Sequence, residues 1–464
     1  MRLVAPTALA LALATAFPAA AQSNEELLKE LRALRDRVAE LEKRVPSSAP
    51  APAAPGQWGM TPEQVRELNR VTIKAEALQD SFSDQGFKGL KISGLIDPTY
   101  IYNRNQNNGT FVFLNGGGAR YTYDNSYFGM AVLDLQKETE SGARWRLTLA
   151  PERGTGALFN GGSIVHEASV SIPLSDLKTR LWLGQIPDWT GYEITLPTGN
   201  KLITHNLLFD TTAPTAYTGA VLDVTSGKWW MRAGVANMNS ARLPKGNSAP
   251  AFIYRVDYSK GEFSGFGFGG VHGKAANFAA DGLWINGNGN PQTFADAGKG
   301  SALHMVEADA FFTRGDWSLF GQVSAGQQQR AAIFNSDGEL RDSRWVGVSA
   351  LAAYKFTPRL EAVLRGDYLK NESNGGGLLG YSFDDPVNGI GRGLLANGSY
   401  AKGDAVGANR YALSAGLNYL FDEGTVFKLE LRRDGADQPV FEVVRNGLFS
   451  KSNTLFGASV VVSF

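Results

Sequence analysis

The sequence predicts an all-β transmembrane fold, a 16-stranded antiparallel up-and-down β-barrel preceded by a short periplasmic coiled coil and a second helix. Three observations predict it. Many segments alternate apolar and polar residues, as strands with one lipid face and one wet face do. Their connections alternate between short turns and long loops. No run of about 18 apolar residues lies beyond the first twenty positions, so membrane-spanning helices are not expected.

The composition of the 464-residue chain fits this class. It holds 54 Gly, 26 Phe, 15 Tyr and 9 Trp, which suits tight turns and aromatic girdles. Cys is absent, which excludes disulfides and Cys-based metal sites. Lys plus Arg number 45 and Asp plus Glu number 45, so no overall field attracts nucleic acid, and no nucleic-acid partner is expected.

Residues 1–21 are predicted to form a secretory signal peptide. Arg2 supplies the positive start, residues 3–17 form a short apolar core, and Ala19 and Ala21 give the small residues of a cleavage site. The mature protein is expected from about Gln22, and no Cys follows the cut, so a lipoprotein is not expected.

Residues 22–45 carry a heptad seam. Apolar residues are spaced alternately four and three apart: Leu27, Leu31, Leu34, Val38, Leu41 and Val45. In a parallel assembly, Glu30 meets Arg35 and Arg37 meets Glu42, both pairs of opposite sign. The pattern favours self-association, and a homotrimer fits it. A helix packed on its own protein is the alternative.

Residues 46–57 form a Pro/Ala linker, and residues 58–87 form a helical connector expected on the periplasmic side. Thr61 is the expected N-cap, with Pro62 in the first turn and Gln64 completing a capping box. This helix is either a rigid connector under the barrel or a segment that partly occludes its mouth.

Residues 88–464 form the barrel. The expected strands are 91–102, 123–136, 143–151, 164–172, 179–186, 216–225, 228–237, 251–259, 262–273, 302–313, 317–328, 344–356, 359–370, 409–421, 425–433 and 454–464. Eight long and seven short connections place both termini on the short-turn side, which in such barrels is periplasmic. A sheet of this size must close to remove its edges, and its interior is too wide for side chains to fill.

Alternation assigns the two faces of each strand. In 317–328, Trp317, Leu319 and Val323 are expected to face lipid, and Ser318 and Gln322 to face the lumen. Strand ends carry Tyr and Phe, which are expected to form interfacial girdles. The lumen is expected to be polar, without a filling core.

The last strand ends on Phe464, and Phe456, Ala458, Val460 and Val462 share its apolar face. This ending resembles the terminal strand that the insertion machinery of bacterial outer membranes reads. From Gln22 onward the chain resembles proteobacterial outer-membrane porins. Its coiled coil ahead of a barrel is similar to sucrose-type and phosphate-selective trimeric porins.

Residues 58–68 and 91–100 also resemble an uncharacterised family of predicted porins of betaproteobacteria. The resemblance implies a homotrimer in the outer membrane, with outer-membrane lipid around it. It further implies a third external loop that folds inward and narrows the pore.

The third long connection, 187–214, mixes apolar and charged residues in a way that predicts a loop packed on the inner wall. A loop folded over a neighbouring subunit is the alternative. The candidate constriction residues of this loop are Asp188, Trp189, Tyr192, Glu193, Lys201 and Asp210.

Opposing basic residues are expected on the lumen face of the wall: Arg144, Arg146, Arg180, Arg232, Arg255, Arg365 and Arg410, with Lys428 and Arg432 as further candidates. Lumen acids include Glu167, Asp257, Glu307, Asp309, Glu361, Asp367 and Glu430. Carboxylates that face arginines across a gap create a transverse field. An ion pair within the wall is the alternative for each of these charges.

No enzyme, cofactor or metal site is expected, since the four His lack metal-ligand spacing and no nucleophile elbow is present. The predicted function is passive diffusion of small hydrophilic solutes through a water-filled, loop-constricted outer-membrane channel. The alternative is a plugged structural barrel that tethers the outer membrane through its coiled coil.

Overall fold

The computed structural model describes residues 67, 69–74, 88–113, 128–150, 164–238, 250–277, 283–285, 288, 290–295, 299–332, 340–371, 387–403 and 406–464. The chain divides into two units, Met1–Lys88 and Gly89–Phe464. In the first unit, Glu67 and residues 69–74 are helical, within the predicted connector helix. The predicted signal peptide, coiled coil and linker lie outside the described residues. Within those residues, no helix has the length and apolar composition needed to cross a membrane.

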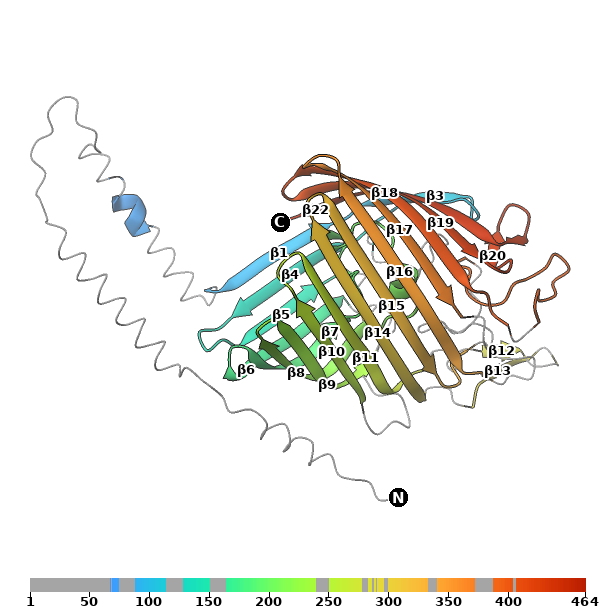
Figure 1. The fold of residues 1–464 in the computed structure, drawn as a ribbon, viewed down its shortest axis with the longest axis horizontal. Helices are drawn as coiled ribbons and strands as arrows, with labels where there is room; N and C mark the ends of the chain where they lie inside the picture. The colour runs from blue at the N-terminus through green and yellow to red at the C-terminus, as the bar shows by residue number, and fades with distance from the viewer. Residues whose placement is uncertain are drawn as a thin grey trace, which may run out of the picture. The chain divides into compact units, whose positions relative to one another are not determined.

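The second unit is a closed antiparallel β-barrel (Figure 1). In the described residues sixteen strands form its wall, the first of them in two pieces: β1 (Leu90–Ile96) with β2 (Thr99–Asn103), β4 (Ala131–Glu138), β5 (Arg144–Leu149), β6 (Val165–Asp176), β7 (Thr179–Pro187), β8 (Ala216–Ser226), β9 (Trp229–Met238), β10 (Ala251–Ser259), β11 (Ser264–Ala276), β14 (Gly300–Arg314), β15 (Trp317–Gln328), β16 (Ser343–Lys355), β17 (Leu360–Lys370), β18 (Arg410–Asp422), β19 (Thr425–Ala436) and β22 (Ser452–Ser463). The predicted antiparallel barrel and its sixteen strands are confirmed.

The barrel closes where the first wall strand meets the last. β1 pairs with β4 and with β22, so Leu95 lies opposite both Val132 and Ser463. The amide N of Phe464 also donates to Gly94 O at 3.0 Å. β2 continues this pairing along β22. Neither end of the sheet is therefore left as an open edge at this seam.

The first wall strand breaks at Asp97. The buried carboxylate accepts hydrogen bonds from Thr99 Oγ1 at 3.0 Å, from the amide N of Gly129 at 3.1 Å, and from Ser459 Oγ. Pro98 follows, which has no N–H to donate to a ladder. The chain thereby changes direction without leaving the wall.

Short and long connections alternate as predicted. The short turns join neighbours such as β8 with β9 and β14 with β15, and Gly227 and Gly315 in these turns have positive φ of 59° and 58°. Three long connections contain strands that the sequence did not predict: β3 (Asn108–Val112), the pair β12 (Leu283–Ile285) and β13 (Pro291–Thr293), and the pair β20 (Phe441–Val443) and β21 (Leu448–Ser450). We call the two ends of the barrel the short-turn end and the long-connection end.

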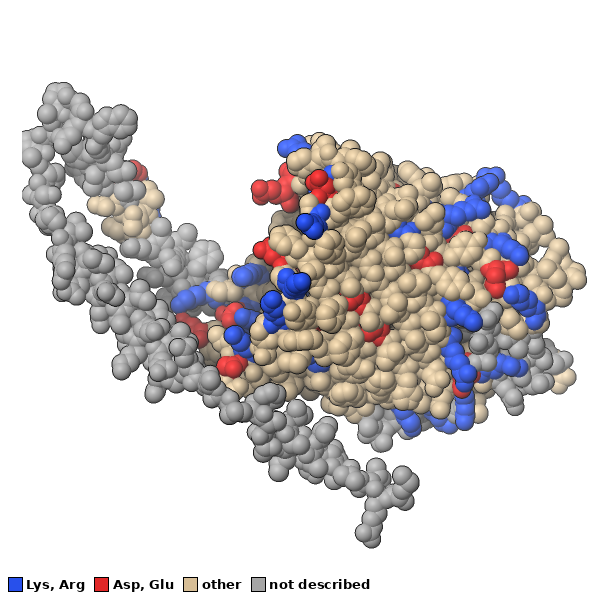
Figure 2. All heavy atoms as spheres, in the orientation of Figure 1, with Lys and Arg blue, Asp and Glu red and all other residues tan. Residues whose placement is uncertain are grey.

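The two faces of the wall follow the predicted alternation. In β15, Val323 is 52% exposed and Ser324 is 4% exposed. In β18, Tyr411, Leu413 and Leu417 are exposed while Arg410 and Ser414 are buried. Uncharged surface covers most of the outward side over β14–β17, and charged atoms gather toward the strand ends (Figure 2). The outward face is therefore suited to lipid.

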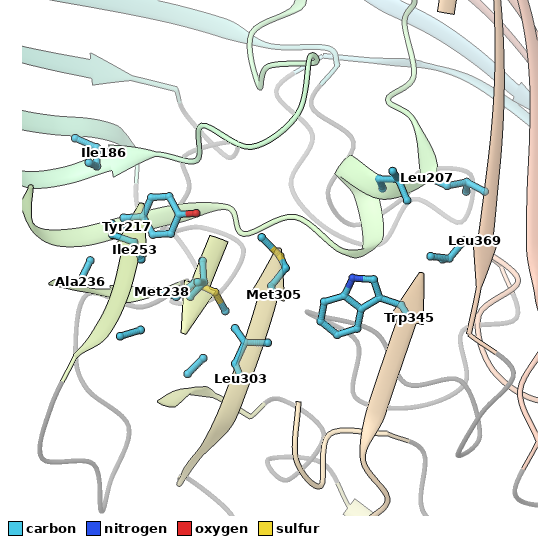
Figure 3. Close-up of a cluster of buried hydrophobic side chains, with 14 of the residues drawn as sticks. Ile186, Leu207, Tyr217, Ala236, Met238, Ile253, Leu303, Met305, Trp345 and Leu369 are labelled. Atoms are coloured by element: carbon cyan, nitrogen blue, oxygen red, sulfur yellow. The ribbon is translucent and has the colours of Figure 1, made fainter. Parts of the chain in front are cut away.

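The inner face differs from the prediction of a wholly polar lumen. A buried apolar cluster lies toward the long-connection end, on the inward side of strands from opposite parts of the wall (Figure 3). Met238 of β9, Met305 of β14 and Trp345 of β16 belong to this cluster. Leu207 and Leu208 belong to the same cluster, and they lie in the connection between β7 and β8. The sequence analysis did not predict this cluster, because most of its members lie on strands that alternate as expected but place these apolar side chains toward the lumen.

Candidate functional site

The connection 188–215, which we call the inner loop, packs against the inner wall. It contains a 3-10 turn, η1 (Pro197–Gly199), and a short helix, α5 (Leu207–Thr211). Lys428 Nζ in β19 donates to Pro197 O at 2.7 Å and to Asn200 O at 2.6 Å. Asn418 in β18 donates to Lys201 O at 2.8 Å. The predicted packing of this segment on the inner wall is therefore present within the single chain.

Two asparagines fix the local conformation of the inner loop. The side chain of Asn206 caps α5 by accepting from Leu208 N at 2.9 Å and Phe209 N at 2.8 Å. Such a cap satisfies amide groups that the first helical turn leaves unpaired. Asn200 Oδ1 accepts from Ile194 N at 2.9 Å. The loop thus carries its own polar framework, which the sequence analysis did not identify.

Glycines in the wall make room for the loop. A Cβ added at Gly347 in β16 would clash with Leu208, and one added at Gly416 in β18 would clash with Leu202. Both glycines occupy inward positions, where other residues would carry a side chain into the lumen. Leu202 and Leu208 therefore lie directly against the wall backbone.

Arg365 is the central anchor of the inner loop. Its side chain is 0% exposed, and Nη1 donates to Glu193 Oε1 at 2.8 Å and to Thr204 O at 2.6 Å. Nη2 donates to His205 O at 2.9 Å. Glu193 Oε2 in turn accepts from Asn206 N at 2.6 Å. Two predicted constriction residues, Arg365 and Glu193, therefore meet as a buried pair.

Glu430 and Arg432 on β19 hold the same stretch of the loop. Glu430 Oε2 accepts from Ile203 N at 2.9 Å and from Thr204 N at 2.8 Å. Arg432 Nη1 donates to His205 O at 2.6 Å. The backbone of residues 203–205 is therefore hydrogen-bonded to side chains of two wall strands, Arg365 on β17 and Glu430 and Arg432 on β19. The sequence placed Glu430 and Arg432 in the lumen but gave no sign of their loop partners.

Asp210 and His205 are buried and have shifted pKa values. Burial raises the pKa of Asp210 to about 7, although Arg432, with Nη1 4.0 Å from Asp210 Oδ2, opposes that shift. Burial lowers the pKa of His205 to about 3, so its imidazole is neutral. The ring of His205 stacks on Phe209 with centroids 4.0 Å apart. Neither Asp210 nor Glu193 presents its charge to open solvent.

Asp188, Trp189 and Tyr192 lie at the start of the loop. Asp188 accepts from Tyr217 Oη at 2.7 Å, and burial raises its pKa. The ring of Trp189 lies 4.8 Å from that of Tyr217 and 4.6 Å from Cζ of Arg232. Tyr192 Oη lies 2.6 Å from Ser349 Oγ on β16. These side chains anchor the loop to both β8 and β16.

Lys201 and two further arginines make ion pairs. Lys201 Nζ lies 2.7 Å from Glu361 Oε1. Arg255 Nη1 lies 2.7 Å from both Glu307 Oε1 and Asp309 Oδ2, as an ion pair within the wall. Arg410, which is fully buried, lies 3.3 Å from Asp434. The positive charge of each of these three side chains is therefore paired with a carboxylate nearby.

Arg144, Arg146 and Arg180 lie apart from the loop anchors, toward the short-turn end. Arg144 pairs with Glu138 at 3.1 Å, and Arg146 pairs with Asp134 at 2.9 Å. Arg180 Nε donates to Ser171 Oγ at 2.6 Å, and its Nη2 donates to Gly142 O at 2.7 Å. The structure therefore separates the predicted basic residues into those that contact the inner loop, those that pair within the wall, and a group beside β5–β7.

Three cavities flank these groups. One of about 500 Å³ lies against β1 and β4–β9 and includes Arg144, Arg146 and Arg180. One of about 210 Å³ lies between Lys201 and the β16–β19 wall. A third of about 290 Å³ lies between Tyr192 and β9–β11, β14 and β15. The inner loop thus occupies part of the barrel and leaves space beside it.

Comparison with solved structures relates the barrel to known outer-membrane proteins. OmpT of Vibrio cholerae, folded in vitro, is 11% identical with a TM-score of 0.50, over 81% of this chain and 97% of that chain. An anion-selective porin from Comamonas acidovorans is 11% identical with a TM-score of 0.48, over 81% and 99%. OmpF of Salmonella typhi, in complex with daunomycin, is 12% identical with a TM-score of 0.46, over 81% and 97%. The likeness to OmpT supports an outer-membrane β-barrel fold.

Comparison of sequences gives a family. No curated protein matches the chain. One family model, described as "Protein of unknown function (DUF3138)", matches residues 2–464. The protein therefore belongs to the DUF3138 family, and its fold is a 16-stranded antiparallel β-barrel.

Proposed function

We propose that this protein is an outer-membrane channel through which small hydrophilic solutes diffuse passively. The observation that supports this most directly is a loop fixed by buried ion pairs inside a closed barrel, with cavities left beside it. Sixteen strands enclose an interior that side chains alone do not fill. In this proposal the barrel catalyses no reaction and needs no cofactor.

The inner loop narrows the channel in this proposal. Glu193, Asp210, Arg365 and Arg410 act mainly by holding the loop and wall together, because they are buried. Solutes meet the groups beside the loop instead. These are Arg144, Arg146 and Lys201, whose side chains are 53%, 37% and 31% exposed, together with their ion-pair partners Glu138, Asp134 and Glu361. The balance of the two signs sets the ion preference.

Conductance in planar lipid bilayers tests the proposal. The mature wild-type protein should form open channels, and a variant without residues 190–206 should conduct more per channel because the obstruction is gone. Arg433→Gln, at an exposed outward position on β19, is the matched control and should conduct as the wild type does. Wild-type protein that folds but passes no current contradicts the proposal.

A plugged barrel that tethers the outer membrane is the second candidate. The apolar cluster that joins opposite walls through Leu207 and Leu208 favours it. In that case the wild type is closed, while removal of 190–206 opens it. The same pair of recordings therefore separates the two functions.

The proposed assembly is a homotrimer in the outer membrane, surrounded by lipid, with the N-terminus in the periplasm. The heptad seam of residues 22–45 is the support for self-association. We assign Phe464 and its outward neighbours to recognition by the barrel-insertion machinery. A protein that runs as a monomer in mild detergent contradicts the trimer.

A further inference from the structure

The cavity of about 500 Å³ at the short-turn end has an excess of positive charge. Three acids line it: Glu138, Glu167 and Asp223. Six basic residues line it: Lys91, Lys137, Arg144, Arg146, Lys178 and Arg180. Asp134, whose Oδ1 lies 2.9 Å from Arg146 Nε, is a fourth acid beside this group. Even if each of the four acids neutralises one basic group, two positive charges remain. Such a site attracts an anion, and guanidinium groups suit a carboxylate in particular.

Aromatic surface lies in the same cavity. Trp230 on β9 lines it and is 41% exposed. Its indole is held in place, because Nε1 donates to Asp223 Oδ2 at 2.9 Å and Cζ of Arg232 lies 3.9 Å from the ring centroid. Trp182 on β7 also lines the cavity. A fixed, half-exposed indole offers a stacking surface for a planar ring.

The basic groups are also positioned by the wall. Arg180 is buried, and its guanidinium is fixed by Ser171 and by the carbonyl of Gly142. The side chain of Arg144 is 53% exposed although it pairs with Glu138. Arg144 therefore remains accessible to a second anion. The volume lies within the roughly 300–1,000 Å³ typical of small-molecule sites.

We propose that this cavity binds aromatic carboxylates, with the ring against Trp230 and the carboxylate toward the basic group of Arg144, Arg146 and Arg180. The proposal rests on the proposed channel, since it names the solute class that passes. Indole faces also stack on sugars, but a neutral sugar gains nothing from the excess positive charge. The combination of charge and aromatic surface favours an anion with a planar ring.

The test uses the full mature protein folded in detergent and then placed in bilayers. Benzoate binding is measured by calorimetry, and block of the channel current is measured in parallel. Acetate tests the need for the ring, and benzylammonium tests the sign of charge. Benzoate should bind and block at lower concentrations than acetate, and benzylammonium should do neither.

Two matched pairs of variants locate the site. Trp230→Leu should weaken benzoate binding by about three- to tenfold, the loss expected for one aromatic contact. Trp229→Leu is its control, since Trp229 is 40% exposed on the outward face. Arg144→Gln should weaken benzoate and acetate alike, whereas Arg314→Gln, at an exposed outward position on β14, should change neither. If Trp230→Leu does not fold, Trp230→Phe should retain benzoate binding.

The outcomes separate this inference from the channel itself. Equal binding of benzoate and acetate, or equal effects of Trp230→Leu and Trp229→Leu, overturns the aromatic site even if the channel conducts. Benzoate binding that depends on Trp230 in a protein without conductance supports the site and overturns the channel.

Discussion

Single residues inside the barrel act mainly as anchors. Arg365 is the clearest case, because one buried guanidinium joins Glu193 to the backbone carbonyls of Thr204 and His205. Sequence reasoning predicted that Arg365 and Glu193 lie on facing surfaces. It could not show that they touch, because they lie 172 positions apart in the sequence and their contact depends on how the chain between them folds.

Arg365→Ala should release the inner loop. The variant leaves Glu193 buried without its partner, and breaking a buried pair in this way costs about 3–5 kcal/mol. The barrel should stay folded, while 188–215 becomes sensitive to protease in detergent. Arg433→Ala, on the outward face, serves as the control. A loop that remains protected in the Arg365 variant contradicts the anchoring role.

Asp210 should make loop packing depend on pH. Its pKa is raised from 3.8 to about 7 by burial, so the folded loop holds this proton more tightly than the unfolded chain. The stabilising contribution is complete below about pH 4 and is lost as pH rises through about 7. Arg432, Arg365, Glu193 and Asp434 are the charged groups that face it.

Protease sensitivity of the loop between pH 5 and 9 measures this dependence. Asp210→Asn should flatten part of the profile, since the amide does not titrate. Burial also raises the pKa values of Asp188 and Glu193. In the Asp210→Asn variant, the protease sensitivity of the loop should therefore still rise with pH, but by less than in the wild type. Identical profiles for the wild type and Asp210→Asn would exclude Asp210 as the source.

At the scale of elements, the inner loop and the wall are fitted to each other through glycine. Gly347 and Gly416 lie beneath Leu208 and Leu202. Sequence patterns predicted both strands and the apolar character of the loop. They did not predict this fit, because a glycine at an inward position looks the same whether it faces water or a leucine.

The double variant Gly347→Ala, Gly416→Ala should displace the loop. Overpacking a close contact costs typically about 1–3 kcal/mol. Single-channel conductance should change, and the unfolding temperature of the barrel should fall only slightly. Gly366→Ala is the control, because Gly366 lies on the outward face of β17 with open space around it. Equal behaviour of the two variants would argue against a close fit.

At the scale of the whole molecule, the sequence predicted most of the wall. Period-two alternation identified sixteen strands, since the same physical rule applies to each of them. It missed β3 and the two small hairpins, where short segments lack a lipid-facing stripe. It also missed the apolar cluster around Trp345, whose members alternate correctly but face the lumen. Alternation reveals that a strand has two faces, not what covers each face.

Deletion of Phe464 should reduce the amount of protein inserted in the outer membrane. The amide N and carbonyl O of Phe464 both bond to Gly94, and its exposed ring extends the outward face of β22. Surface yield and heat-modifiable migration measure the effect. Phe421→Ala, at an exposed position near the end of β18, is the control for loss of an aromatic girdle residue. An unchanged yield after deletion removes Phe464 from the assembly signal.

The seam between β1 and β22 also sets the order in which this chain can fold. Leu95 and Ser463 are partners although almost the whole barrel separates them in sequence. Every other pair of wall strands joins neighbours in the sequence and can form as the chain is synthesised. The pairing of β1 with β22 can form only after the final residues are present. Until then two long edges stay unpaired and prone to aggregation. The chain therefore needs protection until its last strand arrives, and a protein truncated before β22 keeps both edges open permanently.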